Sequence, residues 1–438
     1  METKEIFELA SKKGIEALQL YVTTAKAISI SLYESQIDNY EINLNTKLVA
    51  KGIYRGKMTS VSVENVDKNT PKMLIDELIK NARVITSKDE VFIYEGSKEY
   101  GKVNTYNDEL NKIPLEEKIN KLYEIDKKIR EKDPDIKDVA SIFYSESSSE
   151  LEIINSKGLH LSSNSNSFQC GAELIKEYDG NSESGYYYIV ENDFNKLDVD
   201  KIVNKALDEV NSRLGGKPCK TGNYDIVLAS EVASSLLSVV LSGLTYEEIS
   251  KNRSYLKDKL GQKVFGDNIT IFEDPLDPKS LASSSFDAEG VATQYKVLVD
   301  KGVINSYVYN LKNAKKANVL PTGNGFRNGE GFVNATLKGE DHSQNDLCEL
   351  VNNGLYISEL DGLHSGLDPI SGKFSLKAGG RMIESGHLTK AIKLITIAGN
   401  VYDMFNNVLA IGNDLEEVKH NSVKSPSVIF KNISVSGN

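Results

Sequence analysis

The sequence predicts an α+β protein, in which an N-terminal half of two helix and antiparallel-strand units precedes a C-terminal domain that is mainly antiparallel β-sheet with a few helices. Three observations support this class. Helical apolar spacing and period-two runs alternate up to residue 216. A linker rich in Pro, Gly and polar residues follows at 217–223. Beyond it, most runs are strand-like and joined by turn residues. The predicted domains are residues 1–110, 111–216 and 222–438.

The first unit begins with a helix predicted over residues 3–21, because its apolar residues recur at three- and four-residue spacing. Alternating apolar and polar residues then predict strands, at 28–32, 37–43, 48–54 and 58–63. Thr70 and Pro71 have the residue types of a helix start, so a second helix is expected to run to Ile85.

The second unit repeats this order. Pro114 opens a predicted helix that stops before Pro134. The strands are predicted at 139–144, 151–154, 167–175 and 185–190, and a further helix at 202–214. The recurrence suggests a duplication, although no residue motif repeats. Chance recurrence in an α+β chain explains it about equally well.

The C-terminal domain is expected to start with a strand at 224–229 and a helix at about 231–241. Turn residues at 300–302 and 384–387 each predict a hairpin. Asn400 has the side chain of a helix cap, and a short helix is expected to follow from Val401 to about Val408.

The composition, with 39% hydrophobic and 26% charged residues, predicts a folded, soluble globular protein. The cysteine pattern given below predicts the cytoplasm. A formal charge of −11 argues against a nucleic-acid partner. Three cysteines, an odd number without CxxC spacing, are typical of reduced thiols: Cys170, Cys219 and Cys348. The longest nearly apolar run, 232–244, contains four serines and is shorter than the roughly 20 residues of a membrane span, so no membrane anchor is expected.

Residues 366–414 carry the most recognisable pattern, with S-G-K-F-S-L at 371–376, I-A-G-N at 397–400 and I-G-N-D at 411–414. This order resembles the C-terminal domain of the TldD/PmbA family of metallopeptidases. A second block agrees with it, namely S-S-S-F-D-A-E-G-V at 283–291, V-D-K-G-V at 299–303 and T-G-N at 322–324. The spacing is similar to the PmbA (TldE) branch rather than the TldD branch.

The resemblance implies a test for zinc. In the TldD branch, an H-E-x-x-x-H motif on the helix after the first C-terminal strand binds zinc together with a late cysteine. Carried across without gaps, its histidines fall on Leu237 and Ser242 and its glutamate on Ser238. These side chains offer neither zinc ligands nor a base, and no cysteine follows Cys348. We therefore expect a packing helix and no zinc cofactor in this chain.

Other chemical motifs receive less support. Glu384 and His387 are separated by Ser-Gly and indicate a turn rather than a metal site. Asp361, His364 and Asp368 have the residue types of a cation site, but a polar turn network is favoured.

The glycine-rich stretch 323–331 lacks the G-x-G-x-x-G register of a nucleotide site. A flexible loop is the default interpretation of it. The resemblance places this stretch near the cleft between domains, so a peptide groove is the second interpretation, with these residues as candidates: Thr322, Gly323, Asn324, Gly325 and Arg327.

The resemblance implies a PmbA/TldE-like component of a zinc metallopeptidase that acts on unfolded peptides. A TldD-like partner would supply zinc, base and water, and activity is expected only with that partner. This chain would contribute a wall and a sheet edge for an extended peptide. The alternative is a non-catalytic peptide-binding or assembly homodimer. An autonomous hydrolase with a serine or carboxylate site is a third hypothesis, for which no motif gives positive support.

Overall fold

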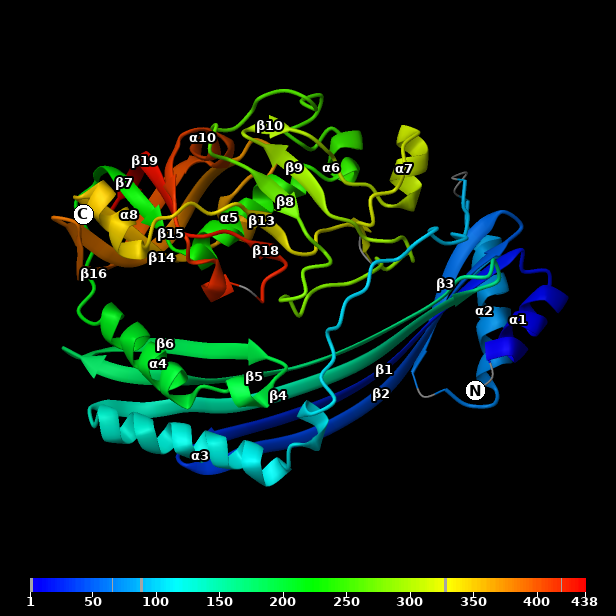
Figure 1. Cartoon of the computed structure of the whole chain (residues 1–438), viewed down its shortest axis with the longest axis horizontal. Helices are drawn as coiled ribbons and strands as arrows, with labels where there is room; N and C mark the ends of the chain where they lie inside the picture. The colour runs from blue at the N-terminus through cyan, green and yellow to red at the C-terminus, as the bar shows by residue number, and fades with distance from the viewer. Residues whose placement is uncertain (1–2, 65, 87–89, 327–328, 419) are drawn as a thin grey trace.

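A computed structural model describes residues 3–64, 66–86, 90–326, 329–418 and 420–438. A long, curved N-terminal sheet lies beneath the C-terminal domain in Figure 1, and the described chain ends at the same side of the molecule as the hairpin of β15 and β16. The predicted α+β class is confirmed. Among the described residues, no helix has both the length and the apolar character needed to cross a membrane.

The first unit differs from its prediction at its start. The helix α1 (Thr3–Lys12) is short, and residues 17–21, predicted to be helical, begin the strand β1 (Ala17–Tyr33). Gly14, at a φ of 82°, separates the two elements, and its missing Cβ makes that conformation accessible. The apolar spacing of 17–21 arises because both faces of this strand are buried.

The remaining strands of the first unit include one that is longer than predicted. The predicted strands 37–43 and 48–54 form one strand, β2 (Gln36–Tyr54), which is followed by β3 (Lys57–Glu64) and α2 (Thr70–Val84). Thr70 does not cap α2 as predicted. Instead the Asp67 carboxylate accepts hydrogen bonds from the backbone N–H groups of Asn69 and Thr70, at 2.8 and 3.0 Å.

The second unit has the same order of elements. The predicted strands 139–144 and 151–154 again form one strand, and the other two predicted strands are longer than expected. The elements are η1 (Leu110–Lys112), α3 (Leu115–Lys132), β4 (Ile136–Asn155), β5 (His160–Tyr178), β6 (Asn181–Glu191), η2 (Phe194–Lys196) and α4 (Val199–Arg213). The predicted helices 114–134 and 202–214 are confirmed within a few residues.

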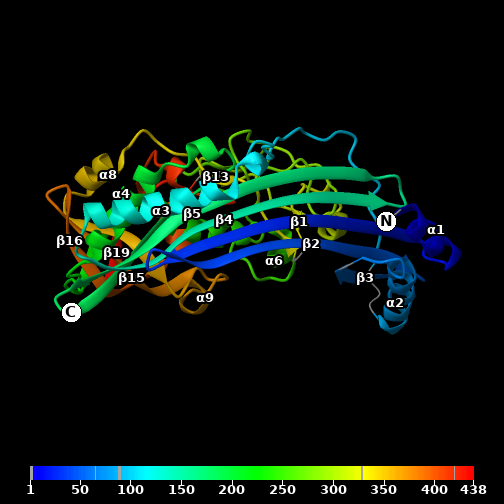
Figure 2. The ribbon, with the colours of Figure 1, turned by 90° about the horizontal axis from the view of Figure 1, so that it is seen from below.

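The two units share a single six-stranded sheet, in the order β3-β2-β1-β4-β5-β6. The strands β1 and β4, one from each unit, pair antiparallel at its centre. Helices α1 and α2 pack on Leu20 and Ala50, and α3 packs on Ile28 and Ile30. Leu20, Ile28 and Ile30 are separated by even numbers of residues along β1, and Ala50 of β2 pairs with Leu20, so these side chains point to the same face of the sheet. Helices α1, α2 and α3 therefore lie on one face of the N-terminal sheet, which Figure 2 shows from below.

The C-terminal domain contains two larger sheets and short helices. Its elements in chain order are β7 (Gly222–Leu228), α5 (Ser230–Ser242), α6 (Tyr246–Ser250), β8 (Ile271–Glu273), β9 (Lys296–Asp300), β10 (Val303–Ile304), α7 (Leu311–Ala317), β11 (Gly325–Phe326), β12 (Gly329–Glu330), β13 (Ala335–Leu337), α8 (Gln344–Val351), β14 (Gly354–Asp361), α9 (Leu363–Gly366), β15 (Lys373–Glu384), β16 (His387–Asn400), α10 (Val401–Asn406), β17 (Val408–Ile411), η3 (Leu415–Val418), β18 (Val423–Lys424) and β19 (Val428–Ser436).

The larger sheet has the order β16-β15-β14-β7-β19-β17, and β16 also pairs with β19. The second sheet has the order β10-β9-β8-β13-β18. Both predicted hairpins are confirmed, at residues 300–303 and 384–387. So is the cap of α10, because the Asn400 side chain accepts hydrogen bonds from the backbone N–H groups of Tyr402 and Asp403. Helix α5 lies in the main hydrophobic core between these sheets.

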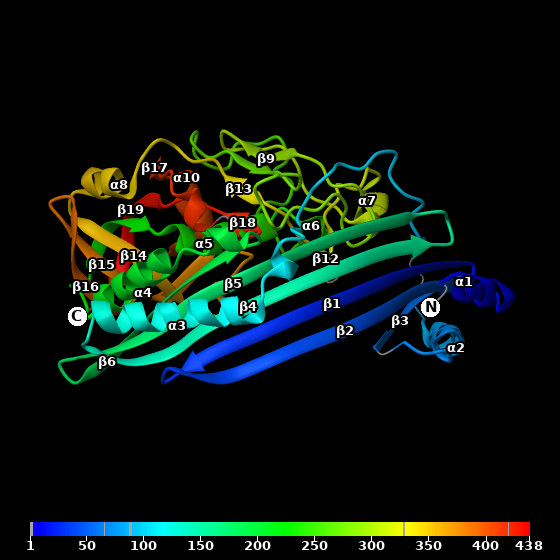
Figure 3. The ribbon, with the colours of Figure 1, turned by 60° about the horizontal axis from the view of Figure 1, so that its bottom comes forward.

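The face of the N-terminal sheet opposite its helices contacts the C-terminal domain. Phe286 packs with Ile153 of β4 in a small buried cluster. The Tyr100 hydroxyl donates to the backbone oxygen of Gly290 at 2.8 Å. Figure 3 shows the four longest strands, β1, β2, β4 and β5, running side by side beneath the C-terminal domain.

Candidate functional site

Helix α5 occupies the place where the family resemblance puts its zinc motif. Leu237 is completely buried in the core. The hydroxyls of Ser238 and Ser242 donate to the backbone oxygens of Ser234 and Val239, at 2.9 and 2.7 Å. Hydroxyl groups that donate to the preceding turn of a helix in this way bond to the backbone of their own helix. The expectation of a buried packing helix is confirmed.

Zinc does not fit the side chains at these positions. Protein zinc sites use thiolate, imidazole or carboxylate ligands. Leu237 has no donor atom, and the two serine hydroxyls already hydrogen-bond to the helix. Within the described part of the chain, no three His, Cys, Asp or Glu side chains gather closely enough to hold a metal ion.

A hollow of about 550 Å³ opens at the C-terminal end of α5. Its lining combines hydroxyl, carboxylate and apolar groups: Ser238, Leu241, Ser242, Gly243, Thr245, Glu247, Glu248, Arg253, Glu330, Phe332, Pro369 and Val423. Arg253 forms a two-pronged ion pair with Glu248, so part of the charge in this hollow is balanced.

Glu330 is the most strongly held carboxylate in the hollow. Its oxygens accept hydrogen bonds from the backbone N–H groups of Glu247 and Asn310, at 2.8 and 3.0 Å, and from the Asn313 side chain at 2.8 Å. Burial raises its pKa, and these hydrogen bonds oppose the rise. Glu330 thereby ties β12 to the starts of α6 and α7. Glu330 was not identified from the sequence, because its partners come from two segments that are distant from it in the sequence.

The predicted peptide-groove residues lie mostly beneath the surface. Gly323, Asn324 and Gly325 are buried, while Thr322 is half-buried and exchanges hydrogen bonds with the backbone of Tyr309. Arg327 lies outside the described residues. The described part of this loop serves as support for neighbouring segments, and its role in a peptide groove stays a prediction.

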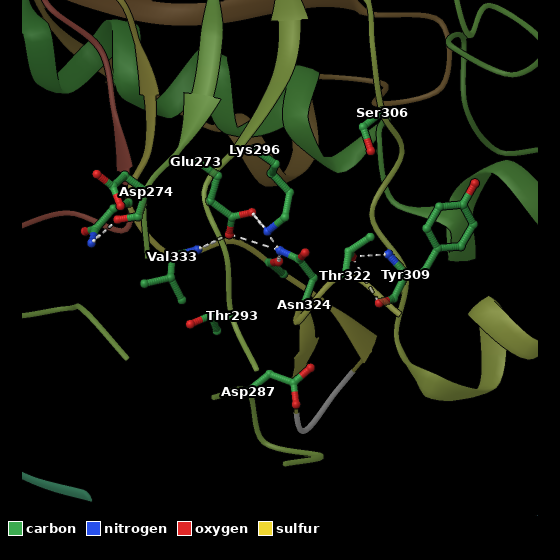
Figure 4. A network of polar contacts seen from close by, with 12 residues as sticks. Glu273, Asp274, Asp287, Thr293, Lys296, Ser306, Tyr309, Thr322, Asn324 and Val333 are labelled. Carbon is green, nitrogen blue, oxygen red and sulfur yellow. Dashed lines mark hydrogen bonds and ion pairs between the residues drawn. The ribbon is translucent and has the colours of Figure 1, made fainter. Parts of the chain in front are cut away.

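Asn324 belongs to a buried polar network, which Figure 4 shows from close by. Its side-chain amide donates to both carboxylate oxygens of Glu273, each at 3.0 Å, and to the backbone oxygen of Gly331 at 2.8 Å. Glu273 also pairs with Lys296 and accepts from the backbone N–H of Val333. The Asn324 Oδ1 atom has no described partner. Three side chains, Asn324, Glu273 and Lys296, thus form a polar network at a place where the glycines predicted a flexible loop.

Asp287, in the second family block, is a further buried acid. Its carboxylate accepts hydrogen bonds from the backbone N–H groups of Gly325, Glu289 and Val291. Burial nevertheless raises its pKa to about 6. Asp287 holds the start of the glycine-rich segment against the turn at 287–291, which is a structural task.

The remaining sequence candidates form polar turns. Glu384 and His387 lie opposite each other at the end of the β15–β16 hairpin. Asp368 accepts hydrogen bonds from the Ser371 hydroxyl and the Ile370 backbone, and Asp361 pairs with Lys377. These contacts agree with the polar turn network favoured for residues 361–368.

Comparison with known proteins links this fold to a family. A family model described as PmbA/TldA metallopeptidase C-terminal domain matches residues 221–437, and one for the central domain matches residues 108–214. A protein of Buchnera aphidicola named Metalloprotease PmbA homolog is 29% identical over 308 residues, which cover 66% of this chain and 67% of that protein.

Solved structures agree with the sequence comparison. A crystal structure from Thermotoga maritima, of a protein named as a proposed modulator of a DNA gyrase, is 29% identical and covers 99% of both chains with a TM-score of 0.90. The structure of TldE from Thermococcus kodakarensis, at 22% identity, shares the fold with a TM-score of 0.88 over 99% of this chain and all of that one. The chain belongs to the TldD/PmbA family of metallopeptidases.

Proposed function

We propose that this chain is the PmbA/TldE-type, non-catalytic subunit of a two-subunit zinc metallopeptidase that cleaves unfolded peptides. A TldD-type partner supplies the zinc, the general base and the attacking water. Two observations support this proposal together. The chain belongs to the family, and Leu237, Ser238 and Ser242 of α5 stand at the positions of the H-E-x-x-x-H zinc motif. A leucine and two internally bonded hydroxyls have no zinc-binding chemistry.

The contribution of this chain is shape. Its long sheet and C-terminal domain form part of a wall that keeps folded proteins away from the partner's metal, while an extended peptide enters. The hollow at the end of α5 supports this proposal, because two of the three motif positions, Ser238 and Ser242, line it. Glu330 lines it with a carboxylate that accepts a hydrogen bond from the backbone N–H of Glu247, and the Glu247 carboxylate pairs with Lys251.

We place the protein in the cytoplasm. All three cysteines are buried as free thiols, which suits a reducing compartment. Burial raises the pKa of Cys170 to about 12, so this thiol stays protonated and unreactive at neutral pH. The cysteines therefore act as core residues.

Reconstitution tests the proposal. The chain is purified alone, mixed with the TldD-type chain of the same genome, and assayed for zinc by mass spectrometry and for cleavage of an unstructured peptide. We expect zinc and cleavage only in the mixture, with about one zinc per pair of chains. Stoichiometric zinc with peptidase activity in the lone chain would refute it.

The same assay separates the alternatives. A lone chain that self-associates and binds peptide, with no gain on mixing, would support the homodimer hypothesis. Cleavage by the lone chain without any metal, insensitive to a chelator, would instead support an autonomous serine or carboxylate hydrolase.

A further inference from the structure

The first half of β2 forms an edge of the N-terminal sheet, with β1 as its only paired strand among the described residues. Strand β3 pairs with β2 only over residues 47–54, whereas β1 pairs along its whole length. Over residues 36–46, no described strand adds to the outer side of β2. At about 3.3 Å per residue, this bare edge is roughly 35 Å long. Its outward backbone N–H and C=O groups form a ready template for another strand.

The same stretch exposes a row of apolar side chains, which we name the β2 strip. It consists of Ile37, Tyr40, Ile42 and Leu44, which are 45, 48, 51 and 75% exposed. Ile42 pairs with Ile28 and Tyr40 with Ile30 on β1, and both β1 partners are buried. Cross-strand partners share a face, so the β2 strip lies on the helix-bearing face of the sheet.

The helices of this face leave the β2 strip uncovered. Helix α2 packs over Leu48 and Ala50, further along β2, and α3 packs over β1 and β4. Neither reaches residues 36–46, which are exposed almost throughout. Figure 3 shows this part of β2 along the outer border of the sheet, between α2 and α3.

The second unit provides an internal comparison. Strand β6 pairs with β5 only from Phe168 onward, so residues 160–166 of β5 form the equivalent edge. The corresponding side chains there are polar, namely His160, Ser162, Asn164 and Asn166. The segment around Thr105 also bonds to that edge, through a bridge to Ser165 and hydrogen bonds between Asn107 and Asn166. The β5 edge is therefore polar and partly covered, whereas the β2 edge is apolar and has no described strand on its outer side.

We propose that the β2 strip and its bare edge are the docking surface for a partner subunit that differs from this chain. The inference rests on the proposed function, which requires such a subunit. The partner presents an apolar strand flanked by Lys or Arg side chains, which adds to the edge of β2 and covers the strip. Exposed apolar rows on a bare edge invite aggregation unless a partner covers them.

The charges of this segment favour a different chain over a second copy. The charged side chains of residues 36–46 are Asp38 and Glu41, and both are acidic. In a symmetric contact the same surface meets itself, so carboxylates would face carboxylates. Like charges across a strand pair are destabilising. A partner strand with basic flanks removes that repulsion.

The position of the strip favours a subunit over a peptide substrate. The C-terminal domain, with α5 and its hollow, lies over the opposite face of the sheet, where Phe286 packs against Ile153. Ile153 pairs with Leu161, an odd position on β5 that faces away from the helices. The β2 strip therefore points away from the region where a peptide would meet the hollow.

Association measurements test the docking surface. The TldD-type chain of the same genome is titrated with the native chain, with the double variant I42S/L44S, and with the matched control S162A/N164A on the equivalent β5 edge. The dissociation constant should rise by about tenfold or more for I42S/L44S, because apolar anchors at interface centres carry most of the affinity. The control should bind within about twofold of the native chain. Hydrogen exchange on the native complex supplies a second readout, in which the outward amides of residues 36–46 should slow.

Each outcome decides a distinct point. Equal binding of I42S/L44S, or unprotected amides at 36–46 in a complex that cleaves peptide, would overturn the docking surface and leave the proposed function standing. Absence of a complex with the native chain would overturn both. Self-association of the native chain that I42S/L44S abolishes would make a second copy the occupant and contradict the proposal.

Discussion

Lys296 Nζ on β9 lies 2.7 Å from Oε2 of Glu273 on β8, and the two side chains are only 10 and 1% exposed. Glu273 also accepts hydrogen bonds from Asn324 and from the backbone of Val333. This pair fixes the second sheet of the C-terminal domain to the glycine-rich loop. Asn324, in the family block at 322–324, is thus held in place by the buried Glu273 carboxylate, which lies far from it in the sequence.

Lys296→Met should lower the free energy of unfolding by about 3–5 kcal/mol, because it leaves the Glu273 carboxylate buried without its cation. Chemical denaturation with urea measures the change. Lys263→Met is the matched control, since Lys263 pairs with Asp267 in an exposed position and should change stability by less than about 1 kcal/mol. Equal effects of the two substitutions would contradict a structural role for the buried pair.

Asp287 should make stability depend on pH between its ordinary pKa of 3.8 and its folded pKa of about 6. An acid with a raised pKa binds its proton more tightly when folded, so its stabilising contribution is full below pH 3.8 and is lost as pH rises through 6. Relative to Asp287→Asn, the native chain should lose about 3 kcal/mol of stability between pH 3.5 and 7. Urea unfolding of both proteins across this range measures the difference, and a constant difference would disprove the assignment.

Leu237→Ala should lower stability by about 2–5 kcal/mol, because it leaves a cavity in the core around α5. Leu350→Ala is the control, since Leu350 is 51% exposed on α8 and should cost less than about 1 kcal/mol. Thermal unfolding ranks the two. A small effect at Leu237 would show that α5 is not the packing helix described above.

Gly302→Ala should destabilise the protein by at least about 2 kcal/mol more than Gly56→Ala. Both glycines have positive φ angles, 83° and 67°. A Cβ on Gly302 would lie 2.1 Å from the backbone oxygen of Phe265, whereas one on Gly56 meets nothing within 4 Å. Calorimetry gives the melting temperatures of the two variants. Gly302→Ala adds a steric clash to the backbone strain, whereas Gly56→Ala adds backbone strain alone, so similar melting temperatures would contradict the close approach at Gly302.

Local patterns predicted the elements whose causes are local. The β15–β16 hairpin and the Asn400 cap of α10 were both predicted from adjacent residues, because a turn or a cap needs only its own few side chains. Helix α3, bounded by Pro114 and Pro134, belongs to the same group. The predicted helix at 17–21 was wrong, since apolar residues on both faces of a strand imitate helical spacing there.

The fold class, the family and the side chains at positions 237, 238 and 242 could be read from the sequence, because composition, turn chemistry and motif order depend on consecutive residues. Three relationships needed the folded chain: the two N-terminal units share one sheet through β1 and β4, Glu273 meets Lys296, and the apolar half of β2 lacks a second paired strand among the described residues. These relationships join segments separated by tens to hundreds of residues. They are stabilised by the burial of side chains and by strand and ion pairing between segments that meet only in the folded protein, and a local sequence pattern does not record such contacts.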